Sequence, residues 1–179
     1  MGYQAGRYTQ GGFGVALGCN AGQTTQGGNA VAVGNGAGRT TQGQYGSAFG
    51  DRAGETSQGS SATAIGYKSG QTDQGSQATA VGYQAGNDTQ GGNAVAVGVS
   101  AGSTTQGTSA IAIGESAGGT AQGNYAVAIG RQTGLSNQSG TATAVGYQAG
   151  STDQGSRSVA MGYRAGQTSQ GNNGVIINS

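Results

Sequence analysis

Small and apolar residues recur along this chain with a period of sixteen residues. Cut before Tyr3, the sequence divides into eleven units that end at Asn178, without insertion or deletion. Numbering the positions of a unit from 1 to 16 places Tyr3 at position 1 and Gly18 at position 16. The consensus unit is x-x-Ala-Gly-x-Thr-x-Gln-Gly-x-x-Ala-Val-Ala-Val-Gly. The units span residues 3–18, 19–34, 35–50, 51–66, 67–82, 83–98, 99–114, 115–130, 131–146, 147–162 and 163–178.

The unit predicts β structure. Positions 12 to 15 alternate small and larger apolar residues, which is the period of a β-strand. Gly occupies position 4 in every unit and positions 9 and 16 in ten of the eleven, a spacing that would destabilise any helix. Sixteen extended residues bent at three glycines can close one turn of a solenoid. We therefore expect an all-β fold, a parallel β-solenoid (β-roll) of eleven 16-residue coils, with residues 1–179 forming a single repeat domain.

The alternation also separates two faces of the predicted strand. Positions 12 and 14 share one face, and positions 13 and 15 share the other. Since a thin coil has room only for small side chains, we expect Ala at positions 3, 12 and 14 inside and position 15 outside. The opposite arrangement, with Val inside, stays open. An outward position 15 would form a continuous apolar stripe, which predicts self-association. The stripe consists of Leu17, Val33, Phe49, Ile65, Val81, Val97, Ile113, Ile129, Val145, Met161 and Ile177.

Position 8 is Gln in all eleven units. Stacked Gln amides can hydrogen-bond along the axis as a structural ladder, or a repeated Gln row can contact a ligand. Invariance in every coil favours the structural interpretation, because a packing position requires it. The residues are Gln10, Gln26, Gln42, Gln58, Gln74, Gln90, Gln106, Gln122, Gln138, Gln154 and Gln170.

Composition changes this picture little. Gly supplies 41 of the 179 residues and charged residues only 7%, as in low-complexity disordered chains. The strict period and a net charge of +1 favour order instead. The charge balance leaves no basic patch for nucleic acid, and no segment is apolar enough for membrane insertion. Met1-Gly2 leads directly into the first unit, so we expect no signal peptide, and the lone Cys19 predicts no internal disulfide.

Catalytic chemistry is not expected. The chain has no His, and its six acidic residues are scattered across five coils. We therefore predict no catalytic residues, no metal site and no cofactor. Charges avoid positions 12 to 16, and neighbouring coils sometimes carry opposite charges in one column, as at Arg39 and Glu55 or Glu115 and Arg131. These pairs predict a solvated face rather than a site.

The segment Asn29-Ala-Val-Ala-Val-Gly34, repeated at residues 93–98 and 125–130, resembles the head repeat of YadA-type trimeric autotransporter adhesins. The Gly-Tyr-Gln-Ala-Gly string at residues 2–6, 82–86 and 146–150 resembles repeats in fibres of phages and large DNA viruses. The resemblance implies a left-handed roll, a homotrimer, and a role in surface attachment or spacing on a cell or virion, with a host-surface or matrix ligand possible. This coil is longer than the usual head repeat, and neck, stalk and membrane anchor are missing.

Ice binding is the alternative function, because flat solenoids with regular outward Thr rows can order water. Position 6 is Thr in eight coils, and Tyr8, Asp88 and Ser136 interrupt the column. A Thr column is also what any β-rich surface favours. The threonine column consists of Thr24, Thr40, Thr56, Thr72, Thr104, Thr120, Thr152 and Thr168.

Overall fold

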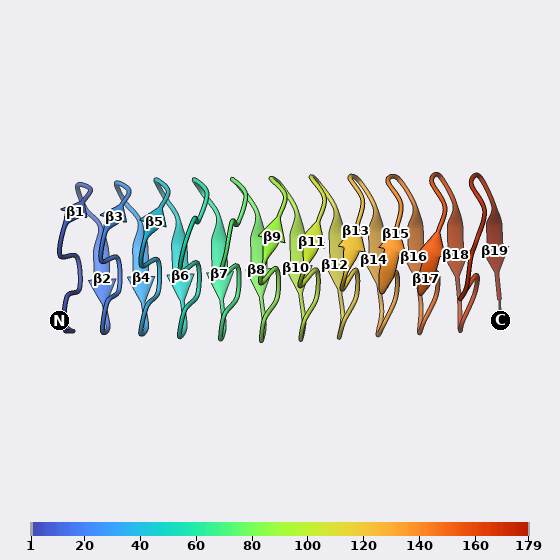
Figure 1. The fold of residues 1–179 in the computed structure, drawn as a ribbon, viewed down its shortest axis with the longest axis horizontal. Helices are drawn as coiled ribbons and strands as arrows, with labels where there is room; N and C mark the ends of the chain where they lie inside the picture. Colours follow the sequence, from blue (N-terminus) through green and yellow to red (C-terminus); the bar gives the residue numbers. More distant parts are fainter. Residues whose placement is uncertain (1, 179) are drawn as a thin grey trace.

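The computed structural model describes residues 2–178, which wind into coils stacked in chain order along one long axis (Figure 1). Strands lying in successive coils pair in parallel, and each residue pairs with the residue sixteen positions later. The predicted all-β parallel solenoid with eleven turns of sixteen residues is therefore confirmed. At about 4.8 Å between paired strands, eleven coils give a rod roughly 50 Å long.

One sheet runs the whole length of the rod and contains a three-residue strand from each coil, at positions 13 to 15. Its strands are β2 (Val15–Leu17), β4 (Val31–Val33), β6 (Ser47–Phe49), β7 (Thr63–Ile65), β8 (Thr79–Val81), β10 (Val95–Val97), β12 (Ile111–Ile113), β14 (Val127–Ile129), β16 (Thr143–Val145), β18 (Val159–Met161) and β19 (Val175–Ile177). The pattern at positions 12 to 15 thus locates the main strand to within one residue.

The opposite side of each coil is less regular. Short strands around position 8 form a three-stranded and a five-stranded sheet, joined by isolated bridges such as that between Gln58 and Gln74. These strands are β1 (Thr9–Gln10), β3 (Thr25–Gln26), β5 (Thr41–Gln42), β9 (Thr89–Gln90), β11 (Thr105–Gln106), β13 (Ala121–Gln122), β15 (Ser136–Gln138) and β17 (Thr152–Gln154). The rod therefore has one continuous sheet and one interrupted sheet.

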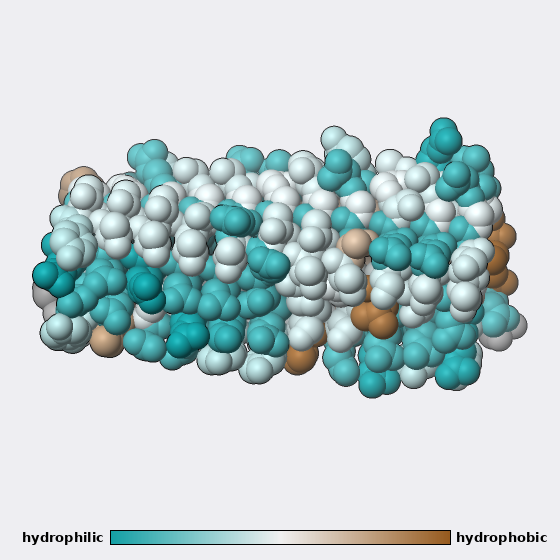
Figure 2. Space-filling model, in the orientation of Figure 1, coloured by the Kyte–Doolittle hydropathy of each residue, from teal (hydrophilic) through white to brown (hydrophobic). Residues whose placement is uncertain are grey.

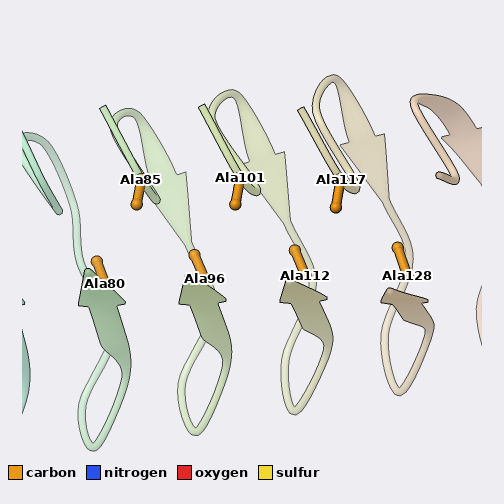
Figure 3. Close-up of a cluster of buried hydrophobic side chains, with 7 residues drawn as sticks. All are labelled: Ala80, Ala85, Ala96, Ala101, Ala112, Ala117 and Ala128. Atoms are coloured by element: carbon orange, nitrogen blue, oxygen red, sulfur yellow. The ribbon is translucent and has the colours of Figure 1, made fainter. Parts of the chain in front are cut away.

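The interior is made of Ala. Across the middle coils, Ala at position 14 faces Ala at position 3 of the following coil, as Ala80 faces Ala85 and Ala96 faces Ala101 in Figure 3. All of these side chains are 0% exposed, while the Val and Ile residues of the same strands point outward. The structure therefore places the Ala columns inside and the apolar stripe outside, as expected, and excludes the opposite arrangement.

The turns differ from the three glycine bends that we expected. Positive φ occurs at positions 4 and 16, but also at positions 2 and 11, where non-glycine residues such as Arg52 (55°) and Tyr45 (60°) take it. Gly27, at position 9, has no positive φ. A Cβ there would lie 2.5 Å from the backbone nitrogen of Gln44 in the next coil. Gly at position 9 thus serves close stacking of the coils and not bending, although coil 9 carries Ser139 there.

Candidate functional site

The apolar stripe lies in one straight row on the outer face of the continuous sheet. Exposure of its larger members ranges from 37% at Ile129 to 53% at Leu17, and reaches 72% at Ile177 in the last coil. The register keeps the row straight, since Val97 pairs with Ile113 and Ile113 with Ile129. Position 13 runs beside it as a half-buried column of Val, Ile, Thr and Ser. This face carries no charged residue, so burying it against another surface desolvates no charge.

Tyr side chains follow the stripe at position 1, across the turn that starts at position 16. Tyr67 stacks on Tyr83 with ring centroids 5.3 Å apart, and Tyr147 stacks on Tyr163 at 5.4 Å. We did not predict these pairs, although Tyr at the same position of adjacent coils was a visible signal for them. Tyr67, Tyr83 and Tyr163 are exposed and Tyr147 is half-buried, so the two pairs add aromatic surface beside the apolar face.

Polar side chains line the far side of the coils as a second ladder. At position 5, Arg39 bonds Glu55 at 3.0 Å, Gln71 donates to the same carboxylate at 2.6 Å, and Asn87 donates to Gln71 at 3.1 Å. The opposite charges expected to approach each other therefore do so. Glu55 and Gln71 are partly buried by this row, which ties coils 3 to 6 together along their surface.

The second predicted pair also forms, with Arg131 Nε 3.1 Å from Glu115 Oε2. The pKa of the Arg131 guanidinium is raised above its ordinary value by its side-chain hydrogen bond to Glu115, and further by the charge of that carboxylate. The Arg131 guanidinium also lies 5.7 Å from the centre of the Tyr147 ring. Both charged side chains are exposed, so water screens the pair and it contributes little to stability.

The threonine column lies where each coil bends into the interrupted sheet. Thr24, Thr56, Thr104, Thr120 and Thr168 are exposed, whereas Thr40, Thr72 and Thr152 are half-buried. At position 7, Thr25 and Thr105 are exposed beside the column. Asp73 and Asp153 take positive φ at position 7, so the backbone of this face changes direction from coil to coil. The Thr residues form patches and not one uninterrupted plane.

The Gln residues from coil 2 onward lie inside the coils, out of reach of a ligand, whereas Gln10 in the first coil is exposed. Gln26 through Gln170 are buried, and Nε2 of each rung donates to Oε1 of the next at 3.0–3.3 Å. The same Nε2 reaches a carbonyl of the preceding coil, as from Gln90 to Thr79 at 2.9 Å. Gly at position 4 leaves room for the amide, because a Cβ on Gly86 would lie 2.9 Å from Gln90. The structure thus shows a structural ladder.

The described residues contain few other groups that could bind a metal or a small ligand. Residues 2–178 contain no group of three or more acidic, Cys or His residues that could hold a metal ion, and no pocket opens among them. The same residues include no helix long and apolar enough to cross a bilayer. Cys19 is exposed as a free thiol. The candidate site is therefore a surface, namely the apolar face formed by positions 13 and 15.

In comparisons with known proteins, the chain matches no protein-family model, no curated protein and no solved structure.

Proposed function

We propose that this solenoid is a non-enzymatic fibre module that acts as a rigid rod for attachment or spacing on the outside of a virion, phage or cell. The observation that carries the proposal is the apolar stripe. It extends along the whole rod, is bordered by Thr, Ser and Val at position 13, and has no charge on its face. Contiguous apolar surface of this length favours contact with another protein over contact with water.

The partner that fits this face is a second and third copy of the same chain. Identical copies side by side present the same 16-residue register, so Val or Ile of one copy can pack against Val or Ile of another at every rung. The number three and the left-handed winding follow from the resemblance to YadA-type heads. A host-surface or matrix ligand would then bind the faces that stay outside the trimer.

Light scattering after size exclusion tests this proposal. The expected mass is that of three 17.1 kDa chains. Changing Ile65 and Ile113 together to Lys should give single chains, because six ammonium groups would be buried at the interface and each costs several kcal/mol there. Both side chains are about 40% exposed in the isolated rod, so the coil itself should tolerate the change.

The matched control changes Thr89 and Thr105, which are exposed on the other side of the coils, to Lys. This variant should keep the mass of the unmodified protein and its β-sheet circular dichroism. An unmodified protein that stays at 17.1 kDa at high concentration would refute self-association through the stripe.

Ice binding is a second candidate function, supported by the exposed Thr pairs at positions 6 and 7 of coils 2 and 7. In adjacent coils these rows repeat at the strand spacing, as Thr25 pairs with Thr41 and Thr89 with Thr105. For this candidate we expect thermal hysteresis that disappears when Thr72 and Thr104 are both changed to Tyr. If the unmodified protein shows no thermal hysteresis, the ice-binding function is refuted.

A further inference from the structure

The last coil departs from the repeat at one interior position, position 14, and at one turn position, position 16. Ile176 occupies position 14, which is Ala in the other ten coils, and Asn178 occupies position 16, which is Gly in the other ten. Both changes fall in the coil whose outer edge, strand β19, has no further strand beside it. Figure 2 shows hydrophobic residues gathered at this end of the rod, and Ile176 and Ile177 are exposed there.

Position 16 is where a further coil would have to approach most closely. From Gly18 to Gly146 these glycines have φ between 122° and 133°. A Cβ on any of them would lie 2.3–2.8 Å from the carbonyl oxygen at position 16 of the next coil. Real Cβ atoms do not approach a carbonyl oxygen so closely. Asn178 takes no positive φ, so coil 11 does not repeat at this position the backbone conformation on which the other coils stack.

The Asn178 side chain also replaces a hydrogen bond that stacking provides in the other coils. At each junction, the position-1 carbonyl accepts the position-2 N–H of the next coil, as Tyr147 O accepts from Arg164 N at 2.8 Å. Tyr163 is at position 1 of coil 11, and its carbonyl accepts from Nδ2 of Asn178 at 2.9 Å. A side-chain amide thus satisfies a backbone group at the end of a regular element, as capping residues do for helices.

The glutamine ladder keeps its ordinary carbonyl bonds in coil 11. Nε2 of Gln170 donates to Val159 O at 2.9 Å and to Gly174 O at 3.0 Å, as Gln90 does to the equivalent carbonyls of Thr79 and Ala94. At the other end of the rod, Gln10 is exposed, and Oε1 of Gln26 is buried without a hydrogen-bond partner within residues 2–178. The two ends of the solenoid therefore differ, because Tyr163 O accepts from the Asn178 side chain at one end and Gln26 Oε1 has no donor at the other.

We infer that Asn178 and Ile176 form a cap that blocks end-to-end stacking of another coil on strand β19. The partner excluded is a second copy of this chain, whose strand β2 has the same length and register as the strands already in the sheet. Open edges of apolar strands recruit other strands, and natural sheets carry specific devices against it. This cap acts along the rod axis and is independent of how many chains associate side by side.

Restoring the repeat tests the cap. The double variant Asn178→Gly with Ile176→Ala should form end-to-end oligomers, with light-scattering masses at twice the unmodified assembly or higher multiples as concentration rises. Electron micrographs should show rods lengthened by whole multiples. The control, Asn173→Gly, changes an exposed residue of the same coil outside the cap and outside the apolar face, and should keep the unmodified mass. An unchanged mass in the double variant overturns the block to stacking.

A second variant tests the hydrogen bond alone. Asn178→Asp keeps the shape of the side chain but removes the N–H that Tyr163 O accepts. Amide hydrogen exchange in coil 11, including the Asn178 N–H bonded to Met161 O, should become about five- to tenfold faster, as for a lost cap. Asn173→Asp, an exposed Asn in the same coil, should leave exchange unchanged. Equal exchange in both aspartate variants overturns the capping role of Asn178.

Discussion

Replacing Gly82 by Ala should lower the free energy of unfolding by about 3 kcal/mol or more, because two separate penalties coincide at this position. Gly82 has φ of 133°, which residues with a side chain rarely adopt. A Cβ would also lie 2.5 Å from the carbonyl oxygen of Gly98, and this oxygen belongs to the backbone of the next coil. Neither penalty can be relieved by moving a flexible side chain.

Gly92→Ala is the matched control, since its Cβ would meet only Ser76 O at 3.4 Å and its φ is not positive. We expect it to stay within about 1 kcal/mol of the unmodified protein. Urea unfolding followed by circular dichroism measures both. Equal stability of the two Ala variants would mean that close stacking at position 16 does not hold the coils together.

The second large effect is expected at the glutamine ladder. Gln90 is 1% exposed, accepts from Gln74 Nε2, and donates to Thr79 O and Gln106 Oε1. Gln90→Glu keeps the shape but turns the donating nitrogen into a carboxylate oxygen that faces these acceptor oxygens. A buried ionised carboxylate with Gln74 Nε2 as its donor and two acceptor oxygens facing it costs several kcal/mol, so we expect a loss of about 3–5 kcal/mol at pH 7.

This loss should depend on pH. Burial beside acceptor oxygens raises the pKa of the introduced carboxyl in the folded chain above its value of about 4.3 in the unfolded chain. The folded state then binds the proton more tightly than the unfolded state does. The variant should therefore be least destabilised below about pH 4, where both states are protonated, and lose stability as the pH rises through the folded-state pKa.

Gln44→Glu provides the control, because Gln44 is exposed at position 10. Its stability should change by less than about 0.5 kcal/mol and show no such pH dependence. Urea titrations of both variants at several pH values measure the difference. A Gln90→Glu protein as stable as the control at pH 7 would show that the ladder does not contribute to the fold.

Much of this architecture could be predicted from periodicity alone. The sixteen-residue period fixes which residues stack, so the register of every pair in the long sheet, such as Val95 with Ile111, follows from the spacing. The small size of Ala predicts its place inside a narrow coil. The invariance of Gln predicts that it is part of the packing, because an exposed side chain need not be the same in every coil.

The turns were harder to predict because the residues that make them are not uniform. Position 11 has φ near 60° whether it carries Phe13, Asn93 or Arg157, so no residue type marks the left-handed conformation there. Stacking of neighbouring coils imposes it, against the preference of most side chains. The prediction of a bend at the position-9 glycine was wrong, because this glycine allows a close approach between coils.

The sequence predicted the Arg39–Glu55 pair at position 5, but not the extension of that ladder through Gln71 to Asn87 or the bond from Asn178 to Tyr163. They depend on where the chain directs polar groups after the turns, and the repeat gives only the column in which a residue lies. The deviation of coil 11 from the consensus was visible, with Ile176 and Asn178 as larger residues. The role of Asn178 could be inferred only once the structure placed the carbonyl of Tyr163 beside its side chain.

The hydrogen bonds between coils have a mechanical consequence, because they run parallel to the rod axis. Tension applied to the two ends of the chain loads these bonds in series, so coils detach one at a time from the weaker end. Each detached coil releases sixteen residues, about 55 Å of extended chain, in place of a rise of about 4.8 Å. A rod held under load would therefore yield by lengthening in even steps, and limit the force that reaches whatever it is attached to.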